Sequence, residues 1–145
     1  MKTLIIIKPD GVKRGLVGEI LSRFERRGIK FLALKLIKVT RSQASQLYAV
    51  HKEKPFYSDL IDYITSGPVV VGVIKIPLSE VDNKESAIQL VRAIVGATNP
   101  AEAPPGTIRG DFGLNIRKNI IHASDSPQAA EKEISIFFKP EEMVG

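Results

Sequence analysis

The sequence predicts an α+β fold in which four strands form one antiparallel sheet and helices pack against one face of it. Three observations lead to this prediction. Short apolar runs and amphipathic helical stripes alternate along the chain, and a long segment rich in proline and glycine, residues 97–118, precedes the last apolar run. The chain has 145 residues, and no change of composition divides it. We therefore expect a single domain over residues 1–145.

The strands are predicted from apolar runs or from partial alternation of apolar and polar residues. They are residues 3–8, 29–39, 69–74 and 120–122. The first run ends at Pro9-Asp10-Gly11, which is a strong turn signal. The run Val69–Ile74 is the strongest strand signal, because valine and isoleucine fill every position except Gly72.

Helices are predicted where apolar residues recur at i, i+3, i+4 and i+7. Such stripes fall in residues 17–28, 40–51, 56–64, 88–95 and 127–138. Gly28 and Gly96 end two of them. Thr40-Arg41-Ser42-Gln43 fits a capping box, and Ser126-Pro127 opens the last helix. The order of elements predicts a ferredoxin-like split βαβ sandwich with a long loop before the last strand.

The chain carries a net charge of +5, and its pI is about 9.5. A basic balance suggests polyanionic partners, either nucleic acid or phosphorylated small molecules. The basic residues are scattered apart from small groups such as Lys13-Arg14, which argues against a nucleic-acid surface. The absence of cysteine excludes disulfides and thiolate metal sites, and two histidines argue against a structural zinc site.

The N-terminal apolar run, residues 4–7, is too short for the apolar region of a signal peptide. No other segment approaches the length of a membrane span. We therefore expect a soluble, cytoplasmic protein.

The stretch Asn119-Ile-Ile-His-Ala-Ser-Asp-Ser126 carries one of the two histidines. His122 ends a short apolar run, at the point where a buried strand is expected to meet a turn. The strand fixes such a histidine while the loop leaves it reachable, which suits a nucleophile or a general base. The alternative is a histidine on the surface or satisfied in the core, which is the more common case for a lone histidine.

Residues 97–118 show no long period of either kind. Loops of this length in compact domains are usually functional or disordered. The segment is poor in acid and contains hydroxyl, amide and guanidinium donors at Thr98, Thr107, Arg109, Asn115 and Arg117. This composition favours a loop ordered over a phosphate site rather than a linker.

The candidate residues form a set that suits phosphoryl transfer. Around His122 the set comprises three cations and three hydroxyl or amide donors, namely Lys8, Arg92, Arg109, Tyr48, Thr98 and Asn119. The sequence contains no glycine-rich loop with the Walker spacing. A neutral imidazole can accept a phosphoryl group while cations neutralise its oxygens, and a second step can then hand the group on.

Five segments of the chain resemble the nucleoside diphosphate kinase family and occur in that family's order. The stretch from Asn119 to Ser126 is similar to the family's active-site signature. The other segments are Ile7–Val12, Lys54–Phe56, Ser66–Val69, and Ala97–Pro100 taken together with Pro105–Phe112. The resemblance covers nearly the whole chain.

The resemblance implies an enzyme that transfers the γ-phosphate of a nucleoside triphosphate, mainly ATP, to a nucleoside diphosphate and so maintains NTP and dNTP pools. It implies that His122 becomes a phosphohistidine, that Glu133 hydrogen-bonds the other ring nitrogen, and that Asp125 assists through water. Phe56 and Ile116 would contact the two faces of the base. The residues implied to bind nucleotide are Lys8, Tyr48, Phe56, Leu60, Arg92, Thr98, Arg109, Ile116 and Asn119.

The family resemblance also implies Mg²⁺ carried on the nucleotide phosphates rather than held in a protein metal site. The implied partners are nucleoside tri- and diphosphates, with no membrane, and a homo-oligomer that is a hexamer or a tetramer. His51 lies outside the implied site.

Three positions depart from the family pattern. Val50 stands where many members have a carboxylate, Ala123 stands where glycine is common, and the segment Ile76–Ala87 is several residues longer than usual. Two other roles remain as alternatives. One is a nucleic-acid-binding or regulatory protein on the same fold, against which the complete set of site residues argues. The other is a structural scaffold, which does not explain the donor-rich segment 97–118.

Overall fold

The computed structural model describes residues 1–145 apart from the side chain of Leu78. The described residues form a four-stranded sheet in the order β2-β3-β1-β4, in which every neighbouring pair is antiparallel. The strands are β1 (Lys2–Ile7), β2 (Lys30–Ile37), β3 (Val69–Lys75) and β4 (Ile121–Ala123). The predicted α+β fold with its four-stranded antiparallel sheet is confirmed.

Helices connect the strands and extend beyond them. The α-helices are α1 (Pro9–Lys13), α2 (Val17–Glu25), α3 (Arg41–Leu47), α4 (Tyr57–Ile64), α5 (Lys84–Val95), α6 (Ile108–Phe112) and α7 (Pro127–Phe137). Short 3₁₀ helices are η1 (Ala49–His51), η2 (Leu78–Glu80), η3 (Pro100–Glu102) and η4 (Pro140–Glu142).

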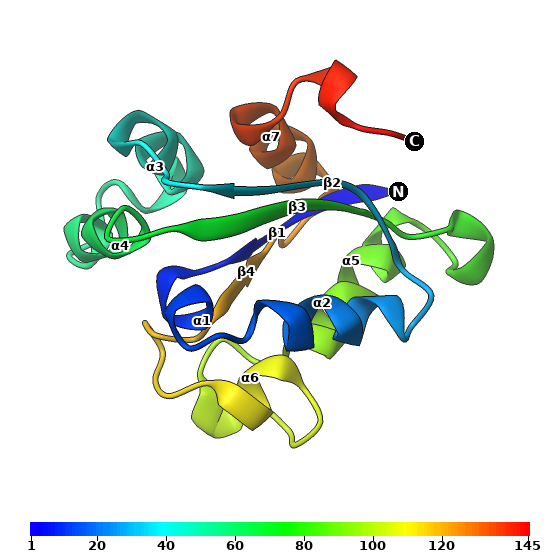
Figure 1. Ribbon diagram of the computed structural model, residues 1–145, viewed down its shortest axis with the longest axis horizontal. Coiled ribbons are helices and arrows are strands. Elements are labelled where there is room, and N and C mark those ends of the chain that lie inside the picture. Colours follow the sequence, from blue (N-terminus) through cyan, green and yellow to red (C-terminus); the bar gives the residue numbers. More distant parts are fainter.

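The helices lie on both faces of the sheet (Figure 1). One face packs against α2 and α5 through buried residues that include Ile5 and Val91. The other face packs against α3, α4 and α7 through buried residues that include Ile6 and Ile64. The prediction that the helices cover one face is therefore wrong. The physical reason is that β1 is apolar on both faces from Leu4 to Ile7, so each face needs a cover.

Two segments that were predicted to be turn or loop contain short helices. Pro9 ends β1 as predicted, but it also begins α1, because its fixed φ suits the first helical position. Residues 97–118 contain η3 and α6. Helix α6 begins after Thr107, whose Oγ1 accepts a hydrogen bond from the backbone N–H of Gly110 at 2.9 Å. By contrast, the capping box between Thr40 and Gln43 is present as predicted.

The end of β1 and the start of β4 meet at one edge of the sheet core. In the register of these strands His122 lies opposite Ile6. Lys8 follows β1 directly, and its backbone N–H donates to the carbonyl oxygen of Ile120 at 2.7 Å. Gly11 permits this approach, because a Cβ there would lie 3.1 Å from Ile120 Cγ2. The side chains of Lys8 and His122 are thus fixed by adjacent segments, the end of the central strand β1 and the edge strand β4.

Candidate active site

A cleft of about 770 Å³ opens beside the end of β4. Its volume lies in the range of pockets that bind small ligands. Every residue that the family resemblance implies for catalysis or nucleotide binding lines it: Lys8, Tyr48, Phe56, Leu60, Arg92, Thr98, Arg109, Ile116, Asn119, His122 and Glu133. These side chains come from widely separated parts of the chain, and the fold brings them around one cavity.

The His122 imidazole is held by a buried carboxylate. Its Nε2 lies 2.7 Å from Glu133 Oε1, and Ser124 Oγ donates to the same oxygen at 2.9 Å. A carboxylate can only accept in this contact, so Nε2 carries the proton and Nδ1 keeps its lone pair. The Glu133 residue is 8% exposed, whereas His122 is partly exposed to the cleft. The imidazole is therefore oriented with Nδ1 available as a nucleophile.

A strained turn precedes the strand that carries His122. Ile120 has a φ of 75°, which is unusual for a β-branched residue. The backbone N–H of Ile121 donates to the carbonyl of Asn119 at 2.8 Å, and the Asp10 carboxylate accepts from Ile120 N–H at 3.1 Å. Such a backbone costs on the order of 1–3 kcal/mol and tends to occur at functional sites. The turn aims the Asn119 side chain toward Lys8.

The amide of Asn119 joins three parts of the cleft. Its Oδ1 accepts a hydrogen bond from Lys8 Nζ at 2.8 Å. Its Nδ2 donates to the carbonyl oxygens of Thr98 and Ile116 at 3.0 and 3.1 Å. Because both ends of this buried amide are used, Lys8 is held in one position relative to the loop that carries Ile116.

The Arg109 side chain anchors the loop through hydrogen bonds to backbone carbonyl groups. Its guanidinium donates to the carbonyl oxygens of Gly96 at 3.1 Å, Asn119 at 3.3 Å and Ile121 at 2.6 Å. Helix α6 supplies this side chain, which is buried. The planar donor set of arginine suits such a bridge, and a lysine could not reproduce it. These hydrogen bonds also hold the positive charge of Arg109 at the cleft.

The cations of the cleft perturb one another. Burial, followed by the nearby charge of Arg109, lowers the pKa of Lys8 to about 8. Burial and the charge of Arg92 lower the pKa of Arg109 to about 10. The mutual repulsion means that these positive charges lie unfavourably close to one another. A polyanion such as a phosphate chain would relieve that repulsion.

The other end of the cleft is apolar and aromatic. Phe56, Leu60 and Ile116 line it, and Ile116 is 56% exposed. Tyr48 also lines the cleft, and burial, followed by the nearby charge of Glu133, raises the pKa of its hydroxyl, which therefore stays protonated. An apolar slot next to a cationic end matches a ligand with a flat ring and phosphates.

His51, which was expected to lie outside the site, lines the cleft. Its ring centroid is 5.6 Å from that of Phe56 and 6.4 Å from that of Tyr48. The reason is that α3 ends at Leu47 and the chain tightens into η1, which turns His51 toward Phe56. The stripe shared by Tyr48 and His51 was a signal that could have identified it.

Several further lining residues were missed. They are Leu47, Val50, Ala123, Ser126, Gln128, Ala129 and Lys132, whereas Arg117, which was predicted only as a donor of the loop, also lines the cleft. The three α7 positions could have been found from helical spacing, because Ala129 lies four residues before the predicted Glu133, and Gln128 and Lys132 are four residues apart on the same helix. Asp125, which was predicted to assist, also lines the cleft. Ala123 occupies extended backbone in β4, where a glycine is not required.

Two findings concern partners of other kinds. Within the part of the chain that the structure describes, no cluster of three or more His, Asp or Glu side chains is arranged to hold a metal ion. None of the described helices is both long enough and apolar enough to cross a membrane.

The fold and the cleft define a class of protein, an α+β protein with an oriented imidazole beside a cluster of cations. The model of the family described as nucleoside diphosphate kinase matches residues 1–143. The chain belongs to the nucleoside diphosphate kinase family. The family resemblance predicted from the sequence is confirmed.

Individual relatives agree with this assignment. A nucleoside diphosphate kinase of Archaeoglobus fulgidus is 56% identical over 99% of this chain and 89% of the relative. One from Chloroflexus aurantiacus is 54% identical over 99% of this chain and 91% of the relative. A crystal structure of a family protein from Babesia bovis has a TM-score of 0.90 and 45% identity over 99% of this chain and 92% of that one.

A second solved structure is a complex with a nucleotide. It is a halophilic nucleoside diphosphate kinase from Halobacterium salinarum in complex with CDP. It aligns with a TM-score of 0.91 and 40% identity over all of this chain and 91% of that one. The ferredoxin-like α+β fold predicted for this chain is thereby confirmed.

Proposed function

We propose that this chain is a nucleoside diphosphate kinase that transfers the γ-phosphate of a nucleoside triphosphate, mainly ATP, through a phosphohistidine at His122. The observation that carries the proposal is the geometry of that imidazole. Glu133 holds Nε2 at 2.7 Å, while Lys8, Arg92 and Arg109 line the same cleft. The proposed role is to maintain the pools of NTP and dNTP.

In the first half-reaction, the lone pair of His122 Nδ1 attacks the γ-phosphorus. The bond from that phosphorus to the β,γ-bridging oxygen breaks, and the nucleoside diphosphate leaves with the electron pair. The Nε2 proton stays hydrogen-bonded to Glu133, whose charge stabilises the positive charge that develops on the ring. The nearby cations stabilise the oxygens of the transferring group.

In the second half-reaction, a β-phosphate oxygen of another nucleoside diphosphate attacks the same phosphorus. The bond between phosphorus and Nδ1 breaks, and the neutral imidazole returns with its Nε2 proton in place. Phe56 and Ile116 would contact the faces of the base rather than its edges. Contact of this kind accommodates different bases, so donor and acceptor can share one cleft.

Mg²⁺ is proposed to enter with the nucleotide. Among the described lining residues, Glu133 is committed to His122 and Ser124, which leaves Asp125 as a carboxylate able to contact a water of the ion. This donor set fits an ion whose ligands are phosphate oxygens and water. When bound, the ion adds positive charge at the phosphates.

We further infer that the subunit is a single domain that works in the cytoplasm as a homo-oligomer, a hexamer or a tetramer. Leu34 and Leu36 support association, because they are 48% and 68% exposed on the edge strand β2. Exposed apolar residues on a sheet edge favour pairing with another chain. A sedimentation mass of one chain would contradict this part of the proposal.

Initial rates with ATP and a nucleoside diphosphate test the proposed function. Varying one substrate at several fixed levels of the other should give parallel lines in double-reciprocal form, as expected for a ping-pong path. Intersecting lines would contradict the phosphohistidine path. A nucleic-acid-binding or regulatory role on the same fold would instead show slight turnover and a steep salt dependence of DNA or RNA binding.

Nucleotide affinity should fall as pH rises through about 8, because the Lys8 ammonium loses its proton there. The charged form is present below that pH, and bound phosphates favour it. We expect ADP to bind about tenfold more weakly at pH 9.5 than at pH 7.5, where the phosphates are already ionised. Calorimetric titration measures this fall in ADP affinity, and Lys8→Met should not show it. An equal fall in ADP affinity in Lys8→Met would contradict the assignment of the pH dependence to Lys8.

Glu133→Gln should lower the rate of phosphoryl transfer by roughly 10- to 100-fold, because the neutral amide no longer stabilises the positively charged ring. Nucleotide binding should change little, since Glu133 faces the imidazole. Rapid-quench measurement of the first half-reaction isolates this step. Glu131→Gln, at an exposed position of the same helix, is the matched control and should leave the rate as in the wild type.

A further inference from the structure

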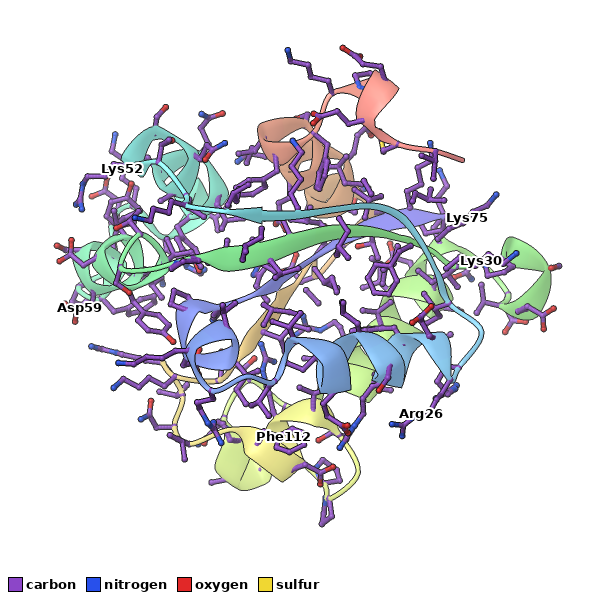
Figure 2. The ribbon with its side chains drawn as sticks, in the orientation of Figure 1. Arg26, Lys30, Lys52, Asp59, Lys75 and Phe112 are labelled. Carbon is purple, nitrogen blue, oxygen red and sulfur yellow. The ribbon has the colours of Figure 1, made fainter. Side chains whose placement is uncertain are left out.

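An ion pair spans the apolar end of the cleft and has no part in the mechanism above. Arg117 Nη1 lies 2.6 Å from Asp59 Oδ2. Asp59 stands in the first turn of α4, and Figure 2 shows it at the end of the sheet opposite Lys30 and Lys75. Arg117 stands between α6 and β4. The pair therefore ties together two segments that are 58 residues apart in sequence.

The two charged residues are sequence neighbours of residues in the two walls of the slot. Asp59 precedes Leu60, and Arg117 follows Ile116. Leu60, Ile116 and Arg117 all line the cleft, together with Phe56. The ion pair therefore links the segment that carries Leu60 to the segment that carries Ile116.

The turn that carries Ile116 is held by hydrogen bonds within itself and to Asn119. Asn115 Oδ1 accepts hydrogen bonds from the backbone N–H groups of Arg117 at 3.0 Å and Lys118 at 2.9 Å. Asn119 Nδ2 donates to the carbonyl oxygen of Ile116 at 3.1 Å. Because these hydrogen bonds connect the residues of the turn, we expect a change in the position of Arg117 to shift Ile116 as well.

We propose that the Asp59–Arg117 ion pair is a positioning element that holds the two walls of the slot at the width of a nucleobase. The inference rests on the proposed function, because it requires a base in this end of the cleft. The two side chains are 56% and 59% exposed, so the pair opens and closes readily. Exposed pairs of this kind change an equilibrium by up to about fivefold.

Asp59→Asn keeps the shape of the side chain and removes its charge. It should raise the KM for ATP and the Kd for ADP by about two- to fivefold and leave kcat unchanged. The reversed pair, Asp59→Arg with Arg117→Asp, should recover most of the affinity that either single reversal loses. If the double variant loses as much affinity as the two single variants lose in sum, the proposal is overturned.

The same helix offers a matched control. Arg41 and Asp62 form an ion pair at 3.1 Å with side-chain exposures of 66% and 62%, and neither residue lines the cleft. Asp62→Asn therefore removes a similar contact from α4 without touching the slot. Its KM should equal that of the wild type, and a rise equal to that of Asp59→Asn would show a general effect on α4 and overturn the proposal.

Ribose 5-triphosphate is a phosphoryl donor that lacks a base. It distinguishes an effect of the ion pair on base binding from a direct contact of Arg117 with phosphate. The Asp59→Asn penalty should disappear with this donor, and an equal penalty would overturn the proposal. Calorimetry with ADP keeps the test separate from the proposed function. If the wild type binds ADP but does not transfer phosphate, the proposed function fails while the Kd values of the variants still report on the ion pair.

Discussion

His122→Ala should lower phosphoryl transfer between nucleotides by about 10⁴-fold or more, because the variant lacks the atom that carries the phosphoryl group. Binding of ADP should persist, since the cations and the apolar slot remain. The fold should also persist, because the His122 side chain is 21% exposed and Glu133 has a second partner in Ser124 Oγ, which donates to it at 2.9 Å in the wild type. Coupled steady-state assays and thermal unfolding measure the two effects separately.

His51→Ala is the control for this experiment, because His51 is the other histidine and lines the same cleft. Its ring contacts Phe56 rather than a carboxylate, so the variant should still form an acid-labile phosphoprotein. Turnover of His122→Ala within tenfold of the wild type would contradict the assignment of the nucleophile.

Lys8→Met should reduce kcat/KM by about 10³-fold and at the same time raise stability at pH 7. The loss of activity follows from removing a positive charge that faces the phosphates. The gain in stability follows because folding buries this charge. The folded pKa of about 8 lies below the ordinary 10.5, which corresponds to a cost of about 3 kcal/mol. Asn119 Oδ1 loses its donor, which offsets roughly 1 kcal/mol of the gain.

The stability difference between the wild type and Lys8→Met should depend on pH. Below pH 8 both states of the wild type carry the charge, so the full cost is present. Between pH 8 and 10.5 the unfolded state binds more protons, and wild-type stability rises toward that of the variant. Denaturant unfolding at pH 7 and pH 10 measures the difference, which should shrink at the higher pH. Lys13→Met, at an exposed position of α1, should change neither stability nor activity. A Lys8→Met variant less stable than the wild type at pH 7 would contradict the account.

The parts of the fold that follow from local chemistry were predictable. The strand runs, the Thr40 capping box and the Ser126 cap each depend on residues close in sequence. The division of helices between two faces was not predictable in this way. It depends on which apolar stripe meets which side of β1, and that is decided by packing across the whole chain.

The site was predictable from motif resemblance to the extent that each implied residue lines one cleft. The contacts that position those residues were not. The brace of Arg109 on three carbonyls and the link from Lys8 to Asn119 join positions that are far apart in sequence. Arg117 was visible as a donor in a loop, but its partner on α4 could be identified only in three dimensions.

The most direct measurement of the central claim is the isolated first half-reaction. The full chain is incubated with γ-labelled ATP and Mg²⁺ in the absence of an acceptor, and the labelled residue is mapped. The account predicts an acid-labile, stoichiometric label on His122 Nδ1 that passes to added nucleoside diphosphate. A wild-type protein that takes up no label, or a His122→Ala variant that is fully labelled, would contradict it.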